Sequence, residues 1–188
     1  EICGFDSWRG EEWKLMGLAS YGEPREDYER MLRELIAVDG TFTVTPQRSQ
    51  AATLAGFAKL LGIRRRKDQP ALDYADLART MQKVFCDVTL DILRNLHQRF
   101  GGENLIYTGG CALNSACNGE IVKHTGFREV YVPAAPADNG NAIGAALMAH
   151  TRHGTASIGH RPGSSAYLGS SMVGRGLSRL LQFSGLEV

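Results

Sequence analysis

Two glycines and a nearby asparagine have the types and spacing to do chemistry. Gly109 and Gly110 follow the apolar, β-prone run 104–108, and Asn114 comes shortly behind them. Glycine lacks a Cβ, so a ligand can approach its backbone closely, and a helix start behind it favours an anion such as phosphate. The Asn114 amide can donate and accept hydrogen bonds. Taken alone, the two glycines favour a tight strand-to-helix turn without a ligand, and a phosphate-binding turn is the functional alternative.

Asp138 lies in a second turn of this kind. It follows a predicted strand over 129–133 and precedes the Ala- and Gly-rich segment 141–150, where we expect a helix. The carboxylate could cap that helix or stand just before the capping residue. It could instead bind a metal ion beside a phosphate group. Both interpretations stay open on the sequence.

A third polar group, Glu12 and Lys14, precedes Met-Gly-Leu-Ala at 16–19 and then Gly22. Side chains two residues apart point to different sides of a helix but share one face of an extended segment. A lysine in a glycine-bounded turn could hold a phosphate, whereas an ordinary amphipathic turn needs no ligand. The basic run 63–73 presents a similar choice, and a solvated loop is favoured there over a phosphate patch.

The elements that must position these residues follow from the apolar spacing. The stripe through 73–100 predicts one long helix, which Gly101 and Gly102 end. The helix-and-strand alternation behind it predicts an α/β fold, and 151–176 has the composition of a linker. Other helices are expected over 11–24, 25–38, 49–61, 112–123, 141–150 and 177–185, and strands over 41–45, 104–108 and 129–133.

Composition narrows the class of protein. The net charge is +1 and no apolar run approaches the roughly eighteen residues that span a bilayer, so we expect neither nucleic acid nor membrane as a partner. Cys3, Cys86, Cys111 and Cys117 form no CxxC pair, which predicts a reduced, cytoplasmic protein with buried apolar thiols. The sequence opens without Met and within a motif, so we expect a piece of a longer protein.

Taken together, the three motifs resemble the O-carbamoyltransferases that modify antibiotics and nodulation factors. The motifs are EEWKLMGLASYG, GGCALN with its trailing Asn118-Gly119, and VYVPAAPADNGNAIGAAL. Their order and gaps match the family pattern over about residues 8–150. The resemblance implies the second half of an actin-like ATPase (ribonuclease-H-like) domain over 1–150. Residues 151–188 would then be a linker and the possible start of a smaller C-terminal domain.

The resemblance also implies a reaction. A smaller domain of the same protein would make carbamoyl-adenylate from carbamoyl phosphate and ATP. The actin-like domain would then transfer the carbamoyl group to a hydroxyl of a natural product or sugar. The glycines at 109–110 and Asn114 would line the nucleotide and its phosphate, and Asp138 would bind the active-site metal, Fe²⁺ or another divalent ion. The catalytic pair Glu12 and Lys14 would face the nucleotide or the acceptor.

Some residues depart from the family pattern. Cys111 stands where Val is usual, and Asn139 behind Asp138 is typical of the related tRNA threonylcarbamoyl-transfer proteins. The family's H-x-x-x-H metal ligands and its later Gly-Pro-Arg-Ala-Leu-Gly motif are missing, and His150 and His153 are not expected to bind metal. We therefore expect only part of a site, inactive alone. An actin-like kinase, a tRNA threonylcarbamoyl-transfer protein and a non-catalytic nucleotide-binding or assembly module remain alternatives.

Overall fold

The computed structural model describes residues 2–38, 44–45, 59, 62–66, 68–154 and 174–184. It divides the chain into two compact units, Glu1–Gly140 and Asn141–Val188. All the candidate site residues lie in the first unit. The helix expected over 49–61 lies almost wholly outside the described residues, as does most of the linker predicted over 151–176.

The second unit carries the two helices predicted last along the chain. Helix α7 (Gly140–His153) confirms the helix expected over 141–150 and extends to His153. Helix α8 (Arg175–Ser184) confirms the helix expected over 177–185.

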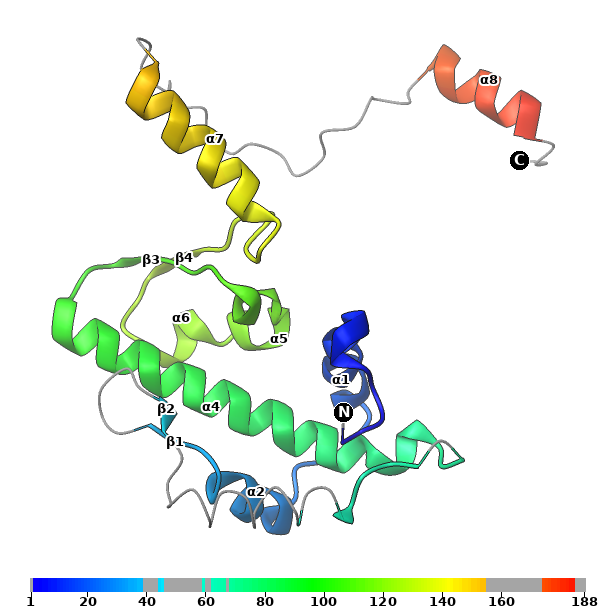
Figure 1. Cartoon of the computed structure of the whole chain (residues 1–188), viewed down its shortest axis with the longest axis vertical. Helices are drawn as coiled ribbons and strands as arrows, with labels where there is room; N and C mark the ends of the chain where they lie inside the picture. Colours follow the sequence, from blue (N-terminus) through cyan, green and yellow to red (C-terminus); the bar gives the residue numbers. More distant parts are fainter. Residues whose placement is uncertain are drawn as a thin grey trace. The chain divides into compact units, whose positions relative to one another are not determined.

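The long helix α4 (Ala75–Phe100) runs through the first unit and confirms the apolar stripe over 73–100 (Figure 1). The 3₁₀ turn η2 (Ala71–Tyr74) leads into it. The helix ends as predicted at Gly101, whose φ of 68° is a conformation that glycine adopts without the penalty of a Cβ. Helix α4 is therefore the support on which the other elements of this unit pack.

Helix α1 (Glu12–Ala19) follows the 3₁₀ turn η1 (Ser7–Arg9) and packs on the first half of α4 (Figure 1). This confirms the short helix expected over 11–24. Leu18 and Ala19 of the Met-Gly-Leu-Ala run are buried, so these two positions serve the core. The cluster they join consists of Cys3, Leu18, Ala19, Ala75, Leu77 and Ala78.

Helix α2 (Glu26–Arg33) packs on the middle of α4 through a second cluster, Leu32, Leu35 and Val84. The helix predicted over 25–38 is wrong at its end. Strand β1 (Ala37–Val38) pairs antiparallel with β2 (Val44–Thr45), so its backbone groups bond across strands instead of along a helix. Part of the strand expected over 41–45 is thus confirmed.

Strands β3 (Asn104–Ile106) and β4 (Glu129–Tyr131) form a parallel pair, with Leu105 opposite Val130. They confirm the predictions over 104–108 and 129–133. Their inner side packs on the second half of α4 through a third cluster, Leu90, Leu93, Leu105, Ile121 and Phe127. Parallel strands joined by a helical crossover, with α4 packed against them, confirm the α/β class.

The crossover between β3 and β4 is not the single helix predicted over 112–123. It consists of three short pieces: η3 (Gly110–Leu113), α5 (Ser115–Asn118) and α6 (Ile121–His124). The break occurs at Asn114, whose ψ of 85° is not helical and whose side chain caps α5 instead. A capping residue within an apolar, helix-prone run explains why periodicity alone predicted one helix.

Within the part of the chain that the structure describes, no helix has the length and apolar character needed to cross a membrane.

Candidate functional site

The two glycine-containing turns meet at the ends of the parallel strands. Gly109 follows β3, and its amide donates a 2.7 Å hydrogen bond to the carbonyl oxygen of Pro136 in the turn behind β4. Carboxyl ends of adjacent parallel strands are where open α/β sheets bind ligands. The structure thus joins the Gly109-Gly110 turn and the turn that contains Asp138 at a position suited to binding.

The backbone at Gly109 and Gly110 is open. Gly109 has φ 98° and ψ 169°, a conformation that essentially only glycine adopts. A Cβ built on Gly110 would meet no atom within 4 Å, and Gly110 lies in the 3₁₀ turn η3 without a positive φ. Packing therefore gives no reason for glycine at 110, whereas close approach by a ligand would give one.

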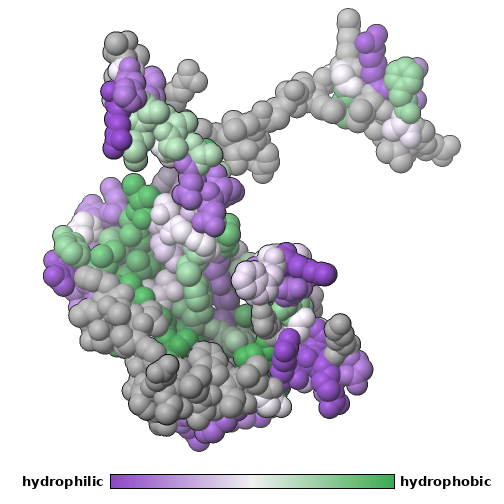
Figure 2. Space-filling model, viewed as in Figure 1, coloured by the Kyte–Doolittle hydropathy of each residue, from purple (hydrophilic) through white to green (hydrophobic). Residues whose placement is uncertain are grey.

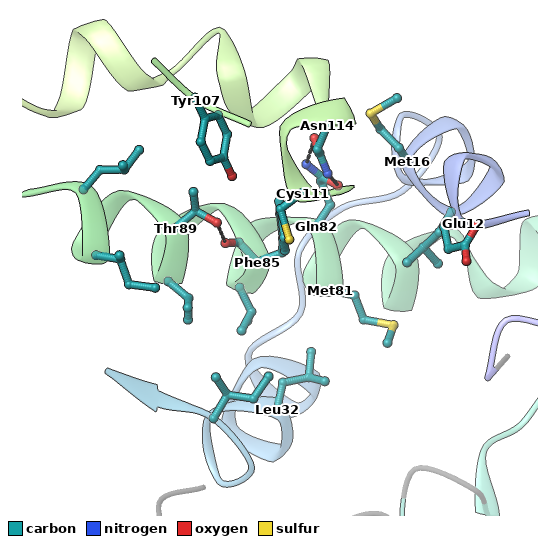
Figure 3. A pocket seen from close by; sticks show the side chains of 16 residues that line it. Glu12, Met16, Leu32, Met81, Gln82, Phe85, Thr89, Tyr107, Cys111 and Asn114 are labelled. Atoms are coloured by element: carbon teal, nitrogen blue, oxygen red, sulfur yellow. Dashed lines mark hydrogen bonds between the residues drawn. The ribbon is translucent and has the colours of Figure 1, made fainter. Parts of the chain in front are cut away.

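Asn114 is held by a network of hydrogen bonds (Figure 3). Its Oδ1 accepts a 3.0 Å bond from the Cys117 amide, which caps α5. Gln82 of α4 faces it in a reciprocal pair: each side-chain amide nitrogen donates to the other's oxygen at 2.9 Å. Gln82 is only 8% exposed, whereas Asn114 is half-buried.

Sequence reasoning missed Gln82. Its signal was a polar residue inside the stripe of α4, one turn from Ala78 and one turn from Cys86. A glutamine buried on the face of a helix needs hydrogen-bond partners, and in the fold Gln82 finds them in the Asn114 side chain. That spacing could have placed Gln82 on an inner face of the helix, but it could not show which side chain it meets.

A cavity of about 610 Å³ lies next to this turn, and apolar side chains are visible on that face of the first unit (Figures 2 and 3). Its walls are mostly aliphatic and aromatic, and a few polar groups converge on it, as is usual for sites of small molecules. The polar residues are Glu12, Gln82, Thr89, Tyr107 and Asn114, with the thiol of Cys111 among them.

The phenol and buried thiols near this cavity stay protonated at neutral pH. Burial raises the pKa of Tyr107 to about 12 and that of Cys117 to about 12. Burial also raises the pKa of Cys86. A thiol is nucleophilic only as thiolate, so neither Cys86 nor Cys117 has the properties of a nucleophile. The expectation of buried, unpaired cysteines holds for Cys3 and Cys117 and is wrong for Cys111, which is exposed.

Glu12 and Lys14 lie on different sides of α1, because the segment is helical. Glu12 is exposed and lines the edge of the cavity. The Lys14 ammonium instead lies 2.6 Å from the carboxylate of Glu11, and its hydrogen bond lowers the pKa of Glu11. Of the predicted pair, only Glu12 thus faces the cavity, and the ion pair with Glu11 was not predicted.

The Glu12–Gly22 segment nevertheless contacts the segment just behind the glycine turn. The hydroxyl of Ser115, at the start of α5, lies 3.9 Å from the sulfur of Met16 on α1. With the bond from Gly109 to Pro136, this contact brings segments of all three motifs into one neighbourhood of the first unit.

Asp138 is exposed and stands two residues before α7 begins, so it precedes the capping position. That outcome matches one alternative left open by the sequence. Among the described residues, no three His, Cys, Asp or Glu side chains gather closely enough to hold a metal ion. A single carboxylate does not make such a site, so the described residues by themselves do not fit a metal centre. The metal role of Asp138 stays a prediction.

The sequence matches known proteins over the region of these motifs. Residues 1–147 match the family model described as carbamoyltransferase N-terminus. The chain is 37% identical over 145 residues to the uncharacterized protein sll1178 of Synechocystis sp., covering 72% of this chain and 23% of that protein.

Two nodulation proteins are similar over nearly the same region. NolNO of Sinorhizobium fredii is 30% identical over 141 residues, covering 73% of this chain and 20% of that protein. NolO of Bradyrhizobium diazoefficiens is 29% identical over 147 residues, covering 77% of this chain and 26% of that protein. The chain thus spans about a fifth to a quarter of these relatives. The match over 1–147 shows that the chain belongs to the carbamoyltransferase family, in the region of its N-terminal model.

Proposed function

We propose that the first unit supplies part of the nucleotide site of an O-carbamoyltransferase, in which a carbamoyl group passes from carbamoyl-adenylate to a hydroxyl of a small acceptor. The observation that carries this proposal is the joined pair of turns, with an open backbone at Gly110 behind a parallel strand. Family membership supports the transfer chemistry. The small-molecule acceptor rests on the resemblance to the O-carbamoyltransferases that modify antibiotics and nodulation factors, and two of the similar proteins are nodulation proteins.

The proposed roles follow the geometry. The adenylate phosphate would approach the backbone at Gly109 and Gly110, where no side chain stands in its way. Asn114 would donate a hydrogen bond to it, and Glu12 would face the nucleotide or the acceptor across the cavity. Fixed donors at this point would stabilise negative charge on the phosphate as the carbamoyl group leaves. Lys14 could join them only by leaving Glu11.

The remainder of the protein would complete the site. We propose that unit 1 is the second half of an actin-like domain, supported by its parallel strands and long supporting helix. A smaller domain elsewhere in the full-length protein would supply carbamoyl-adenylate from ATP and carbamoyl phosphate. Asp138 would give one ligand to a divalent metal whose other ligands lie outside this chain.

The test follows ATP turnover by the full-length protein. With ATP, carbamoyl phosphate and a hydroxyl acceptor or water present, the wild type should release orthophosphate and pyrophosphate as the adenylate forms. It should then release AMP as the carbamoyl group passes from the adenylate to the acceptor or to water. The Gly110→Val variant should still form the adenylate in the other domain but lose AMP release, because branched side-chain atoms would occupy the phosphate position. Gly119→Ala is the matched control, since its Cβ would meet only ordinary contacts, at 3.7 Å or more.

Two results would count against this function. AMP release by Gly110→Val at the wild-type rate would show that the Gly109-Gly110 turn does not bind the adenylate. Absence of any carbamoyl-phosphate-dependent turnover in the wild type would favour the non-catalytic module instead.

A further inference from the structure

The orientation of the Asn114 amide is fixed by its neighbours. The amide of Cys117 is a backbone N–H and can only donate, so the Asn114 atom facing it at 3.0 Å must be the oxygen, Oδ1. The nitrogen, Nδ2, then faces Gln82 Oε1 at 2.9 Å. Gln82 Nε2 completes the ring of bonds by donating to Asn114 Oδ1 at 2.9 Å.

Counting donors and acceptors shows what is left over. An amide oxygen accepts two hydrogen bonds, and Asn114 Oδ1 already accepts two, from Cys117 and Gln82. An amide nitrogen donates two, and Asn114 Nδ2 gives one of them to Gln82. Within this network the Asn114 side chain therefore has one N–H left to offer, and its residue lines the cavity beside the glycine turn.

We infer that Gln82 is a positioning residue that holds Asn114 as a hydrogen-bond donor, so that the ligand atom recognised there is an acceptor, such as a phosphate oxygen. This inference rests on the proposed nucleotide site. Gln82 suits the task because it lies on the rigid helix α4, is 8% exposed and reaches the turn from a segment far away in sequence. Without Gln82, the oxygen of Asn114 would have a free lone pair and its amide could tilt about the cap.

A double-mutant cycle separates positioning from direct contact. The affinity for a non-hydrolysable analogue of carbamoyl-adenylate would be measured calorimetrically on the full-length protein. The variants are Gln82→Met, which keeps the length and removes both hydrogen bonds, and Asn114→Ser, which keeps a capping hydroxyl but is too short to reach Gln82. Gln98→Met, an exposed glutamine in the last turn of α4, is the matched control.

If Gln82 acts through Asn114, Gln82→Met weakens binding about tenfold in the wild-type background and has no further effect on Asn114→Ser. Gln98→Met leaves the affinity unchanged. An equal loss in both backgrounds, or no loss with Gln82→Met while Asn114→Ser loses affinity, overturns the positioning role. Thermal midpoints of all variants identify any that fail to fold, and Gln82→Leu then replaces Gln82→Met.

The donor assignment has its own variant. Asn114→Asp keeps an oxygen for Cys117 and for Gln82 Nε2 but cannot donate, so it should lose the analogue while α5 stays capped. Binding retained by Asn114→Asp overturns the donor assignment. If the wild type does not bind the analogue, the proposed function is overturned. If the wild type binds but the Gln82 and Asn114 variants do not show the expected coupling, only the positioning role of Gln82 is overturned.

Discussion

The amide of Gly109 donates a 2.7 Å hydrogen bond to the carbonyl oxygen of Pro136, and this bond ties together two turns that lie 27 residues apart in the sequence. It joins them just beyond the parallel strands, where the backbone of the first turn is open. The bond explains how motifs far apart along the chain can serve one ligand. Because the Gly109 N–H is already hydrogen-bonded to Pro136, a phosphate at this turn would have to bind the backbone that follows Gly109.

Gly22→Ala should destabilise the protein by about 3 kcal/mol, a strong case of overpacking. A Cβ at this position would lie 2.2 Å from the carbonyl carbon and oxygen of Ala75, at the start of α4. Backbone atoms cannot rotate away, so α1 and α4 would have to separate. Chemical unfolding measures the effect. Gly17→Ala is the control: it lies in α1 with open space around its Cβ position and should be neutral or slightly stabilising. Equal stability of the two variants would contradict this packing.

The adjacent glycines of the first turn should respond differently to alanine. Gly109→Ala should cost about 1–3 kcal/mol, because φ 98° with ψ 169° is strained for any residue with a Cβ. Gly110→Ala should change the free energy of unfolding by less than about 1 kcal/mol, because its Cβ meets open space in a helical turn. Urea unfolding of the two variants side by side checks this, and the opposite ranking would contradict the geometry of the turn.

The charged network between α2 and α4 should make a small, salt-sensitive contribution to stability. Lys83 Nζ lies 2.8 Å from Glu29 and 2.9 Å from Asp87, and Arg33 contacts both carboxylates. Lys83→Met should cost about 1 kcal/mol at low salt, and less at about 1 M salt.

A matched control for this network is Lys123→Met, which removes a pair with Glu120 on one exposed turn. Its effect should be close to zero. The prediction fails if both lysines matter equally, or if added salt leaves the Lys83 effect unchanged.

Stability should fall at alkaline pH because of the buried Cys117 thiol. Its pKa rises from 9.0 to about 12 through burial. Between these values the folded protein keeps a proton that the unfolded chain has lost, so the free energy of unfolding falls as pH rises. The contribution is complete below pH 9.0 and is lost toward pH 12. Thermal midpoints at about pH 8 and about pH 10 measure this slope, which Cys117→Ala should reduce. An unchanged slope in that variant would exclude Cys117 as its source.

Sequence reasoning predicted the secondary structure correctly where the local signals agreed with one another. The stripe of α4 and its end at Gly101 were clear because apolar spacing and a terminating glycine agreed. The end of α2 and the break at Asn114 were missed because strand pairing and side-chain capping compete with helix propensity, and only the tertiary structure decides between them. The actin-like half-domain and the boundary at residue 150 stay predictions.

The residue types of the candidate site could be predicted from the sequence, but the contacts between their side chains could not. Gly109, Gly110 and Asn114 follow a strand as expected, and the cavity lies beside them. The partnership of Asn114 with Gln82 and that of Lys14 with Glu11 depend on side-chain directions that spacing does not give. The assignments to nucleotide and metal remain predictions, because they concern ligands and segments beyond this chain.

The most direct test of the central claim is the affinity of the full-length protein for a non-hydrolysable analogue of carbamoyl-adenylate, the ligand proposed for this turn, measured by calorimetry for the wild type, Gly110→Val and Gly119→Ala. Gly110 has open space where a Cβ would stand, so a side chain there has room among the described residues and would obstruct a ligand that approaches the backbone. The account predicts binding by the wild type and Gly119→Ala, and a loss of at least about tenfold in Gly110→Val with its thermal midpoint preserved. Wild-type affinity in a folded Gly110→Val protein would contradict it.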